Sequence, residues 1–414
     1  MWSYRKPVAT QLPLLGRLGL PLLVTMAIAP AYAAQVYVQP TATLTAENDT
    51  NLDLTPGSPG NVQGYLANVG ALIGIAGPNW DTTISPRLDY RDYPKDSGDN
   101  RLEEYLDFRS DYQTQRSSAS ITGRIDHQDD FNAELTSALY DPFNPVQPTA
   151  PQTGKAEIGL TRTSVLLLPR YDYKITPTMD VGVSGTYQSL NYSPSDDIDH
   201  IDFNYYSGKG FLTWTISPRT DLQFGGYGVK YEATHVDSAA SGGGVSLDSS
   251  TAWTQLFSTD VNVVYQHTNF DSAIPAQPIL KFTNNTWGAT ASAVYKAQVS
   301  QFRFTIGRII TPSGGGGIYV NDQAQFQYTR TVNQRFSFTG AVVALHNHGL
   351  STETASYSRD YLQTVLEAKY MIRPTWFVQG GYQYAWQKYA TDPDGAVNSR
   401  VYVRVGYQGL GRQY

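Results

Sequence analysis

Residues 361–386, YLQTVLEAKYMIRPTWFVQGGYQYAW, contain the pattern from which we predict the fold. Before Pro374, apolar and aromatic residues occupy one parity from Leu362 to Ile372, and glutamine or charged residues occupy much of the other. The same alternation returns between Trp376 and Trp386. Side chains alternate between the two faces of a β-strand, so the pattern predicts two antiparallel strands, each with one apolar face. Pro374 suits the connection because its missing N–H costs no ladder hydrogen bond there.

The composition argues against burying these apolar faces in a soluble core. Only 41% of the 414 residues are hydrophobic, yet the chain carries 30 Tyr, 15 Phe and 7 Trp, spread evenly along it. After the N-terminal segment, no apolar run is long enough for a membrane helix. A closed barrel with lipid outside and water inside accommodates strands of this kind.

The spacing of tight turns indicates how many strands there are. Turns are predicted near residues 78, 117, 177, 218, 259, 299, 333 and 374, mostly about forty residues apart. Each interval holds two strands and a longer polar loop. The sequence therefore predicts an all-β, transmembrane, antiparallel up-and-down barrel of about 18 strands (range 14–18), with short periplasmic turns and longer extracellular loops.

The loops of this barrel are predicted from polar and glycine-rich segments. Residues 238–250 and 312–317 are predicted to be loops. The region with the least clear alternation is 249–283. The longest connection, 129–157, carries four prolines and is interpreted as an outer loop or an inward-folded constriction. The last strand, 401–407, precedes a Gly-Leu-Gly interruption and a terminal Tyr414, and it resembles the outer-membrane assembly signal.

Residues 1–33 are predicted to be a signal peptide, and 34–414 the outer-membrane barrel. Arg5, Lys6 and Arg17 precede an apolar run, and Ala31-Tyr32-Ala33 is typical of a cleavage site, so cleavage is expected after Ala33 or Ala34. Removing these three positive charges lowers the net charge of −6 to about −9. The expected location is the outer membrane of a Gram-negative bacterium, reached through the periplasm, with outer-membrane lipid and the barrel-assembly machinery as partners.

Several kinds of chemistry are excluded or disfavoured. Because it has no cysteine, the chain cannot form disulfide bonds, thiolate metal sites or covalent haem links. A globally acidic chain is a poor nucleic-acid binder. None of the six histidines stands in a nucleophile motif, and His346 and His348 on one strand face are interpreted as surface residues. We therefore expect no enzyme activity, no catalytic residues, no cofactor and no metal site.

If the apolar parity faces lipid, the opposite parity lines the lumen. The predicted lumen-lining residues are Arg87, Arg91, Arg109, Arg124, Arg162, Arg170, Lys209, Lys230, Arg303, Lys369, Arg400, Arg404, Gln379 and Gln383. On this assignment bases outnumber acids in the lumen, which would favour anions. The alternative is that these charges pair across strands and brace the wall, and the sequence leaves both interpretations open.

A family resemblance rests on the opening TATLTAENDTN segment (41–51), the turns at 171–178 and 214–220, which share Ile-(Thr/Ser)-Pro, and the Gly-Tyr hairpin at 380–384. The mature chain resembles the β-barrel porins found beside exopolysaccharide and capsule gene sets in Gram-negative bacteria. The resemblance implies a conduit exporting an acidic exopolysaccharide, working with a periplasmic polysaccharide-export protein, and assigns no functional residues. Two alternatives are a general diffusion porin for small anions or nutrients, which an inward-folded 129–157 would favour, and a structural sheath enclosing a partner protein.

Overall fold

The computed structural model describes residues 35–57, 60–94, 100–134, 139, 160–194, 200–234, 238–272, 280–314, 317–349, 358–390 and 394–413. The predicted signal peptide and its cleavage site lie outside these residues. The strands are β1 (Gln35–Asp49), β2 (Val62–Ala76), β3 (Trp80–Asp92), β4 (Arg101–Gln113), β5 (Ser117–Asp129), β6 (Thr161–Thr176), β7 (Met179–Ser193), β8 (Phe203–Ser217), β9 (Thr220–Ala233), β10 (Ala239–Ala252), β11 (Phe257–Ser272), β12 (Leu280–Lys296), β13 (Ser300–Ser313), β14 (Gly317–Thr331), β15 (Phe336–Gly349), β16 (Arg359–Arg373), β17 (Trp376–Tyr389), β18 (Ala396–Gln408) and β19 (Arg412–Gln413). A short helix, α2 (Asp130–Glu134), follows β5.

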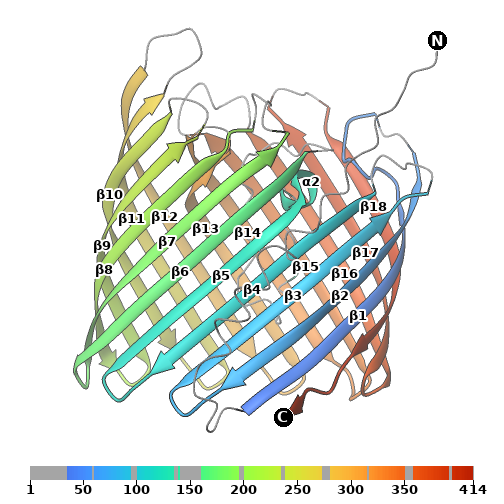
Figure 1. Ribbon diagram of the computed structural model, residues 1–414, viewed down its shortest axis with the longest axis horizontal. Helices are drawn as coiled ribbons and strands as arrows, with labels where there is room; N and C mark the ends of the chain where they lie inside the picture. The colour runs from blue at the N-terminus through green and yellow to red at the C-terminus, as the bar shows by residue number, and fades with distance from the viewer. Residues whose placement is uncertain are drawn as a thin grey trace.

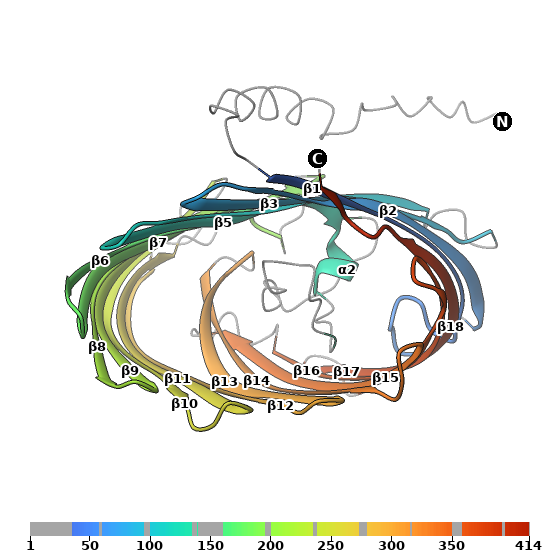
Figure 2. The same ribbon diagram turned by 90° about the horizontal axis from the view of Figure 1, so that it is seen from below.

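The strands form one closed antiparallel ring in sequence order, as predicted. β1 pairs with β2 on one side and with β18 on the other, from Thr41↔Gln408 to Asp49↔Arg400. Figure 1 shows the tilted strands, and Figure 2 shows the ring from below. The interruption at Gly409–Gly411 separates β18 from the two-residue β19, which pairs with Tyr37 and Val38 of β1. The barrel therefore has 18 long strands, and β19 continues the last of them.

The outer face of the barrel is apolar and has aromatic residues toward both ends. On β17, the outward-facing residues include Trp376, Tyr382 and Trp386. On β18, they include Val401, Val403 and Val405, whose side chains are 44–55% exposed. Trp376 and Trp386 are ten residues apart, which corresponds to roughly 25 Å along the axis of a tilted barrel and matches the usual height of a lipid-facing band. Among the described residues, no helix has the length and apolar character needed to cross a membrane.

The turn predictions are confirmed. Strands join at one end through connections of two to four residues, including 77–79, 177–178 and 374–375. The turn expected near residue 259 lies a few residues earlier, at 253–256. The connections at the other end are mostly longer, although β13 and β14 are joined by three residues. In outer-membrane barrels the short turns are periplasmic and the long loops extracellular.

The prediction of a loop at 238–250 is wrong, because these residues form most of β10. The strand is in full register with β9 and β11. Its glycines are required by close packing: a Cβ at Gly242 or Gly244 would overlap the carbonyl oxygen of His267 or Tyr265 on β11. Glycine is common in loops, but here it allows two backbones to approach each other. The loop prediction at 312–317 holds only for its centre, since β13 ends at Ser313 and β14 begins at Gly317.

The upper part of the β13–β14 hairpin leaves the wall and folds into the barrel (Figure 2). Within the described residues, the β12–β13 register ends at Ala289↔Arg308, although β13 continues to Ser313. Near the hairpin tip, Ile318 packs in an internal apolar cluster with Phe203 and Tyr231. The hydroxyl of Tyr231 also donates a hydrogen bond of 3.0 Å to the carbonyl of Ser313. The hairpin thus forms a second layer against the inner wall.

Candidate functional site: the constricted lumen

Helix α2 lies inside the ring of strands (Figure 2). It is only five residues long and follows β5 directly, at the start of the connection for which an inward-folded constriction was one interpretation. Its Phe131 is 4% exposed and packs in a second internal apolar cluster with Val343 and Val365 of the opposite wall. Residue Leu139 packs against the same cluster, and residues 135–138 and 140–159 lie outside the described part. The beginning of this connection is therefore folded into the lumen.

Buried polar contacts attach α2 to both sides of the barrel. Arg162 on β6 lies 3.5 Å from the carboxylate of Glu134, and both side chains are almost fully buried. From β16, the Nη2 of Arg359 donates a hydrogen bond of 2.8 Å to the carbonyl of Glu134. His200, which precedes β8, lies 3.4 Å from Asp130 with both side chains fully buried. Because β6 and β16 are far apart in the ring, these contacts place α2 across the lumen.

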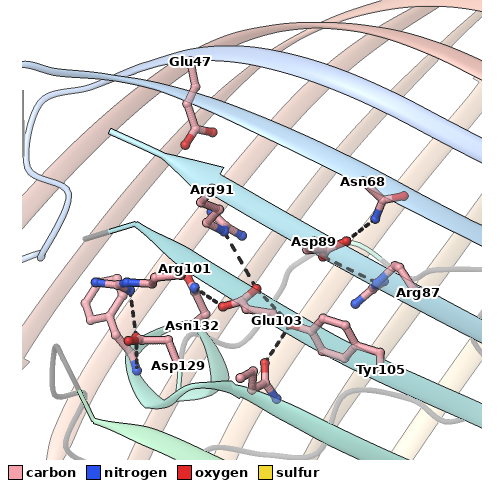
Figure 3. Close-up of polar contacts among 12 residues, drawn as sticks. Glu47, Asn68, Arg87, Asp89, Arg91, Arg101, Glu103, Tyr105, Asp129 and Asn132 are labelled. Carbon is pink, nitrogen blue, oxygen red and sulfur yellow. Dashed lines mark hydrogen bonds and ion pairs between the residues drawn. The ribbon is translucent and has the colours of Figure 1, made fainter. Parts of the chain in front are cut away.

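A network of charged residues on β3, β4 and β5 continues from α2 along the inner wall (Figure 3). Glu103 is 1% exposed and is its centre, because it accepts hydrogen bonds from Tyr105 and from Asn132 of α2 and lies 3.8 Å from Arg91. Arg101 forms an ion pair of 2.7 Å with Asp129. The network links the wall to the start of α2, and each buried carboxylate in it has a polar neighbour, as burial of a charge requires.

The loop after β3 adds one more buried group to this wall. The hydroxyl of Tyr93 donates a hydrogen bond of 2.9 Å to Glu47, and its ring is 2% exposed. Burial raises the pKa of Tyr93 to about 12, with Glu47 acting in the same direction and Arg91 against it. The phenol therefore remains a donor over the whole physiological range of pH.

Most of the predicted lumen bases share the inner parity and have an acidic neighbour. The pairs and distances are Arg87–Asp89 3.5 Å, Arg91–Glu103 3.8 Å, Arg109–Asp111 2.6 Å, Arg124–Asp107 2.7 Å, Arg162–Glu134 3.5 Å, Arg170–Asp172 2.7 Å, Lys209–Asp248 2.7 Å and Arg400–Glu47 3.6 Å. Four of these eight pairs join two strands, three lie within one strand, and the pair Arg162–Glu134 joins β6 to α2, so cross-strand pairing describes half of them. Whether they line a solute path stays a prediction.

The lumen bases Lys369 and Arg404 have a different environment. Both pair in register with Gln379 of β17, one from β16 and one from β18, so their backbones are about 10 Å apart. The Nζ of Lys369 lies 4.0 Å above the ring of Phe377, and Arg404 donates a hydrogen bond of 3.0 Å to Thr45. Glu367 is the nearby acid, and it accepts a hydrogen bond from Tyr402. This row has more positive charge than the ion-paired wall on β3–β5.

The remaining predicted residues divide between the two faces. Gln383 accepts a hydrogen bond from Arg400, and Arg303 has the inner parity of β13. Lys230 was predicted to line the lumen, but it pairs in register with the exposed Tyr206 and shares the parity of Phe224 on the outer face. Its ion pair with Glu232, at 2.6 Å, is largely exposed. The neighbouring apolar residues Val229 and Tyr231 are buried on the inner face, where Tyr231 packs in the same cluster as Ile318 of the β13–β14 hairpin.

The predicted excess of lumen bases is reduced by acids that the sequence assignment missed. Glu47 and Asp49 on β1 have the inner parity of Thr45, and Asp49 pairs in register with Arg400. Asp248 on β10 lies beside Lys209 and Gln223 and accepts a hydrogen bond from Asn262. Asp248 escaped the assignment because its segment was interpreted as a loop. The inner wall is thus mixed in charge, and its basic character is concentrated around Lys369 and Arg404.

The two histidines considered as ligands point outward. His346 pairs in register with Asp360, and its ring lies 5.4 Å from that of His348. In the part of the chain that the structure describes, no group of three or more His, Cys, Asp or Glu side chains could hold a metal ion.

Comparisons with known proteins concern architecture alone. No protein-family model matches the sequence, and no curated protein matches it significantly. Among solved structures, similar chains include opdK of Pseudomonas aeruginosa (11% identity, 91% of this chain and 99% of that chain, TM-score 0.43), OccK5 of the same species (9%, 91% and 98%, 0.41) and OccAB3 of Acinetobacter baumannii (8%, 92% and 99%, 0.43). These values carry no argument about substrate, and the fold is established by the strand order and registers.

A closed barrel with an apolar outer band and a polar interior is suited to a membrane, where lipid contacts the outer band and water contacts the interior. The chain is an outer-membrane β-barrel. Its lumen contains α2 and the upper β13–β14 hairpin.

Proposed function

We propose that this barrel is a diffusion channel for small anionic solutes. The observation that supports it is the position of α2, held across the lumen by Arg162 and Arg359. An inward-folded segment of this kind narrows the path, which limits passage by size. The buried contacts of Glu134 and Asp130 fix the segment in place, so the narrowing is a built part of the fold.

The preference for anions is proposed from the row Lys369–Gln379–Arg404. Two cations flank an amide that can donate hydrogen bonds, and Thr45 adds a hydroxyl beside Arg404. Most other lumen bases have a carboxylate within 4 Å, which reduces their field. A small carboxylate or phosphate reaching this row would gain charge-assisted hydrogen bonds.

Export of an acidic exopolysaccharide with a periplasmic export protein is the competing hypothesis. A polymer needs a continuous open path, and α2 attached to both walls is unfavourable for its passage. A sheath around a partner protein needs an even wider interior. Both hypotheses are therefore supported less well than diffusion of small solutes.

Conductance of the purified protein in planar bilayers separates these functions. We expect steady single-channel conductance, selectivity for chloride over potassium, and no block by acidic oligosaccharides of four or more sugars. Saturable block by such oligosaccharides would support polymer export instead. A complete lack of conductance from correctly folded protein would support the sheath.

A further inference from the structure

The outer face of the barrel carries a groove over β11 to β17, separate from the lumen site. Its volume is about 720 Å³. Four of the residues that line it form one cross-strand row, called here the polar row: Arg308, Asp322, His346 and Asp360. Four others form the next row, called the apolar row: Ile306, Ala324, Ala344 and Leu362. All eight have the outer parity of their strands.

The groove exists because the β13–β14 hairpin folds inward. Above the pair Ala289↔Arg308 the hairpin leaves β12 and packs against the inner wall, so the outer surface recedes there. The floor is formed by small side chains, among them Ala289, Ala324 and Ala344. Trp287 and Trp386 stand at its two sides.

The two rows have a constant order along the barrel axis. In β13 and β15, which run toward the long loops, Arg308 follows Ile306 and His346 follows Ala344. In β14 and β16, which run the opposite way, Asp322 precedes Ala324 and Asp360 precedes Leu362. In each strand the polar residue is therefore on the extracellular side of the apolar one. This is the order of the head group and the chain of a lipid in the outer leaflet.

The polar row reaches into the lipid-facing band. Arg308 is six residues beyond Phe302 of the lower aromatic belt, which places it roughly 15 Å up a band about 25 Å tall. Arg308 and Asp322 form a bidentate ion pair with both bonds at 2.7 Å, and Arg308 also lies 4.8 Å from the ring of Trp287. Charged groups at this depth are costly against hydrocarbon and need polar neighbours.

We propose that the groove binds one phospholipid with a zwitterionic head group. The groove is continuous with the lipid-facing band, so an acyl chain fills the apolar row beneath the head. The polar row carries Arg308, two carboxylates and one imidazole, and it has no cationic surplus. It therefore matches a head that presents a phosphate to Arg308 and an ammonium to Asp322 and Asp360, and it is a poor match for a purely anionic head.

The test uses the full barrel reconstituted in bilayers of phosphatidylethanolamine, phosphatidylglycerol or both, followed by native mass spectrometry. We expect one retained phosphatidylethanolamine for each barrel. Ala344→Phe, which fills the apolar row, should abolish retention. Arg308→Gln with Asp322→Asn removes both charges, leaves a polar side chain at each position and should weaken retention roughly tenfold, because the charge-assisted hydrogen bonds are lost. The matched control, Ala67→Leu on the outer face of β2, should retain the lipid.

Each other outcome overturns the proposal. Equal retention of both phospholipids, unchanged by Ala344→Phe, would mean ordinary annular lipid. Preferential retention of added lipid A would assign the groove to another head-group chemistry. A dimer mass that Ala344→Phe converts to monomer would make the groove a contact between two copies. If Ala344→Phe fails to fold, as judged by heat-modifiable gel mobility, the charge-neutral double variant of Arg308 and Asp322 decides in its place.

Discussion

The Nη2 of Arg359 donates a hydrogen bond of 2.8 Å to the main-chain carbonyl of Glu134. This bond joins β16 to the last residue of α2, while Arg162 contacts the carboxylate of the same residue from β6. A five-residue helix has little intrinsic stability. Its position in the lumen therefore depends on these contacts and on the burial of Phe131.

Replacing Arg359 with alanine should loosen α2 and widen the path. Arg359 is fully buried, so its removal also leaves the carbonyl of Glu134 without this donor. We expect single-channel conductance in planar bilayers to rise about twofold and to fluctuate more. Lys230→Ala, which removes a cation from the outer face, should leave the conductance unchanged. An unaltered Arg359→Ala conductance would mean that α2 does not limit ion flow.

Charge reversal at Arg404 should change ion selectivity. Arg404→Glu replaces a cation next to Gln379 with an anion, opposite Lys369 in the same row. We expect the reversal potential in a salt gradient to move toward cation selectivity. Arg400→Glu should have a smaller effect, because Arg400 lies beside Glu47 and its field is already reduced. If Lys230→Glu on the outer face shifts selectivity as much as Arg404→Glu does, the assignment of the anion site is wrong.

The alternation of side chains was sufficient to predict the barrel, its strand number and its turns. It failed where the inner face is apolar. On β9, Tyr231 lies inside, where it packs in the same cluster as Ile318 of the β13–β14 hairpin, and the alternation therefore places Lys230 outside. The local sequence of β9 does not predict that the β13–β14 hairpin, about ninety residues further along the chain, packs inside the barrel as a second layer.

The site was predictable only in outline. The sequence placed many arginines on the inner parity, but pairing partners such as Asp248 for Lys209 depend on register between strands. The contact of Arg359 with Glu134 joins residues that are 225 positions apart, so spacing gives no sign of it. The proline-rich stretch 129–157 was interpreted as an outer loop or an inward-folded constriction. The position of α2 at its start, inside the ring of strands, agrees with the second interpretation.

Loss of Glu103 should destabilise the barrel far more than loss of an exposed lumen acid. Glu103 is 1% exposed and contacts Tyr105, Asn132 and Arg91. Removing one member of a buried charge network costs roughly 3–5 kcal/mol in the free energy of unfolding. Asp111→Ala breaks the exposed ion pair with Arg109 and should cost no more than about 1 kcal/mol. Urea unfolding in detergent micelles, followed by tryptophan fluorescence, measures both, and equal losses would contradict the buried network.

Closure of the wall at β10 should depend on two glycines. A Cβ at Gly244 would overlap the carbonyl of Tyr265, and one at Gly242 would overlap the carbonyl of His267. Because both obstacles are backbone atoms, β10 and β11 would have to separate, and overpacking of this kind costs roughly 1–3 kcal/mol for each site. We expect Gly242→Ala with Gly244→Ala to lower the folded fraction after insertion into detergent micelles, measured by heat-modifiable gel mobility. Gly208→Ala on β8 is the matched control, since a Cβ there meets no atom within 4 Å. Equal folded fractions for the two variants would show that β10 tolerates side chains at these positions. The close approach of β10 and β11 would then not explain the glycines.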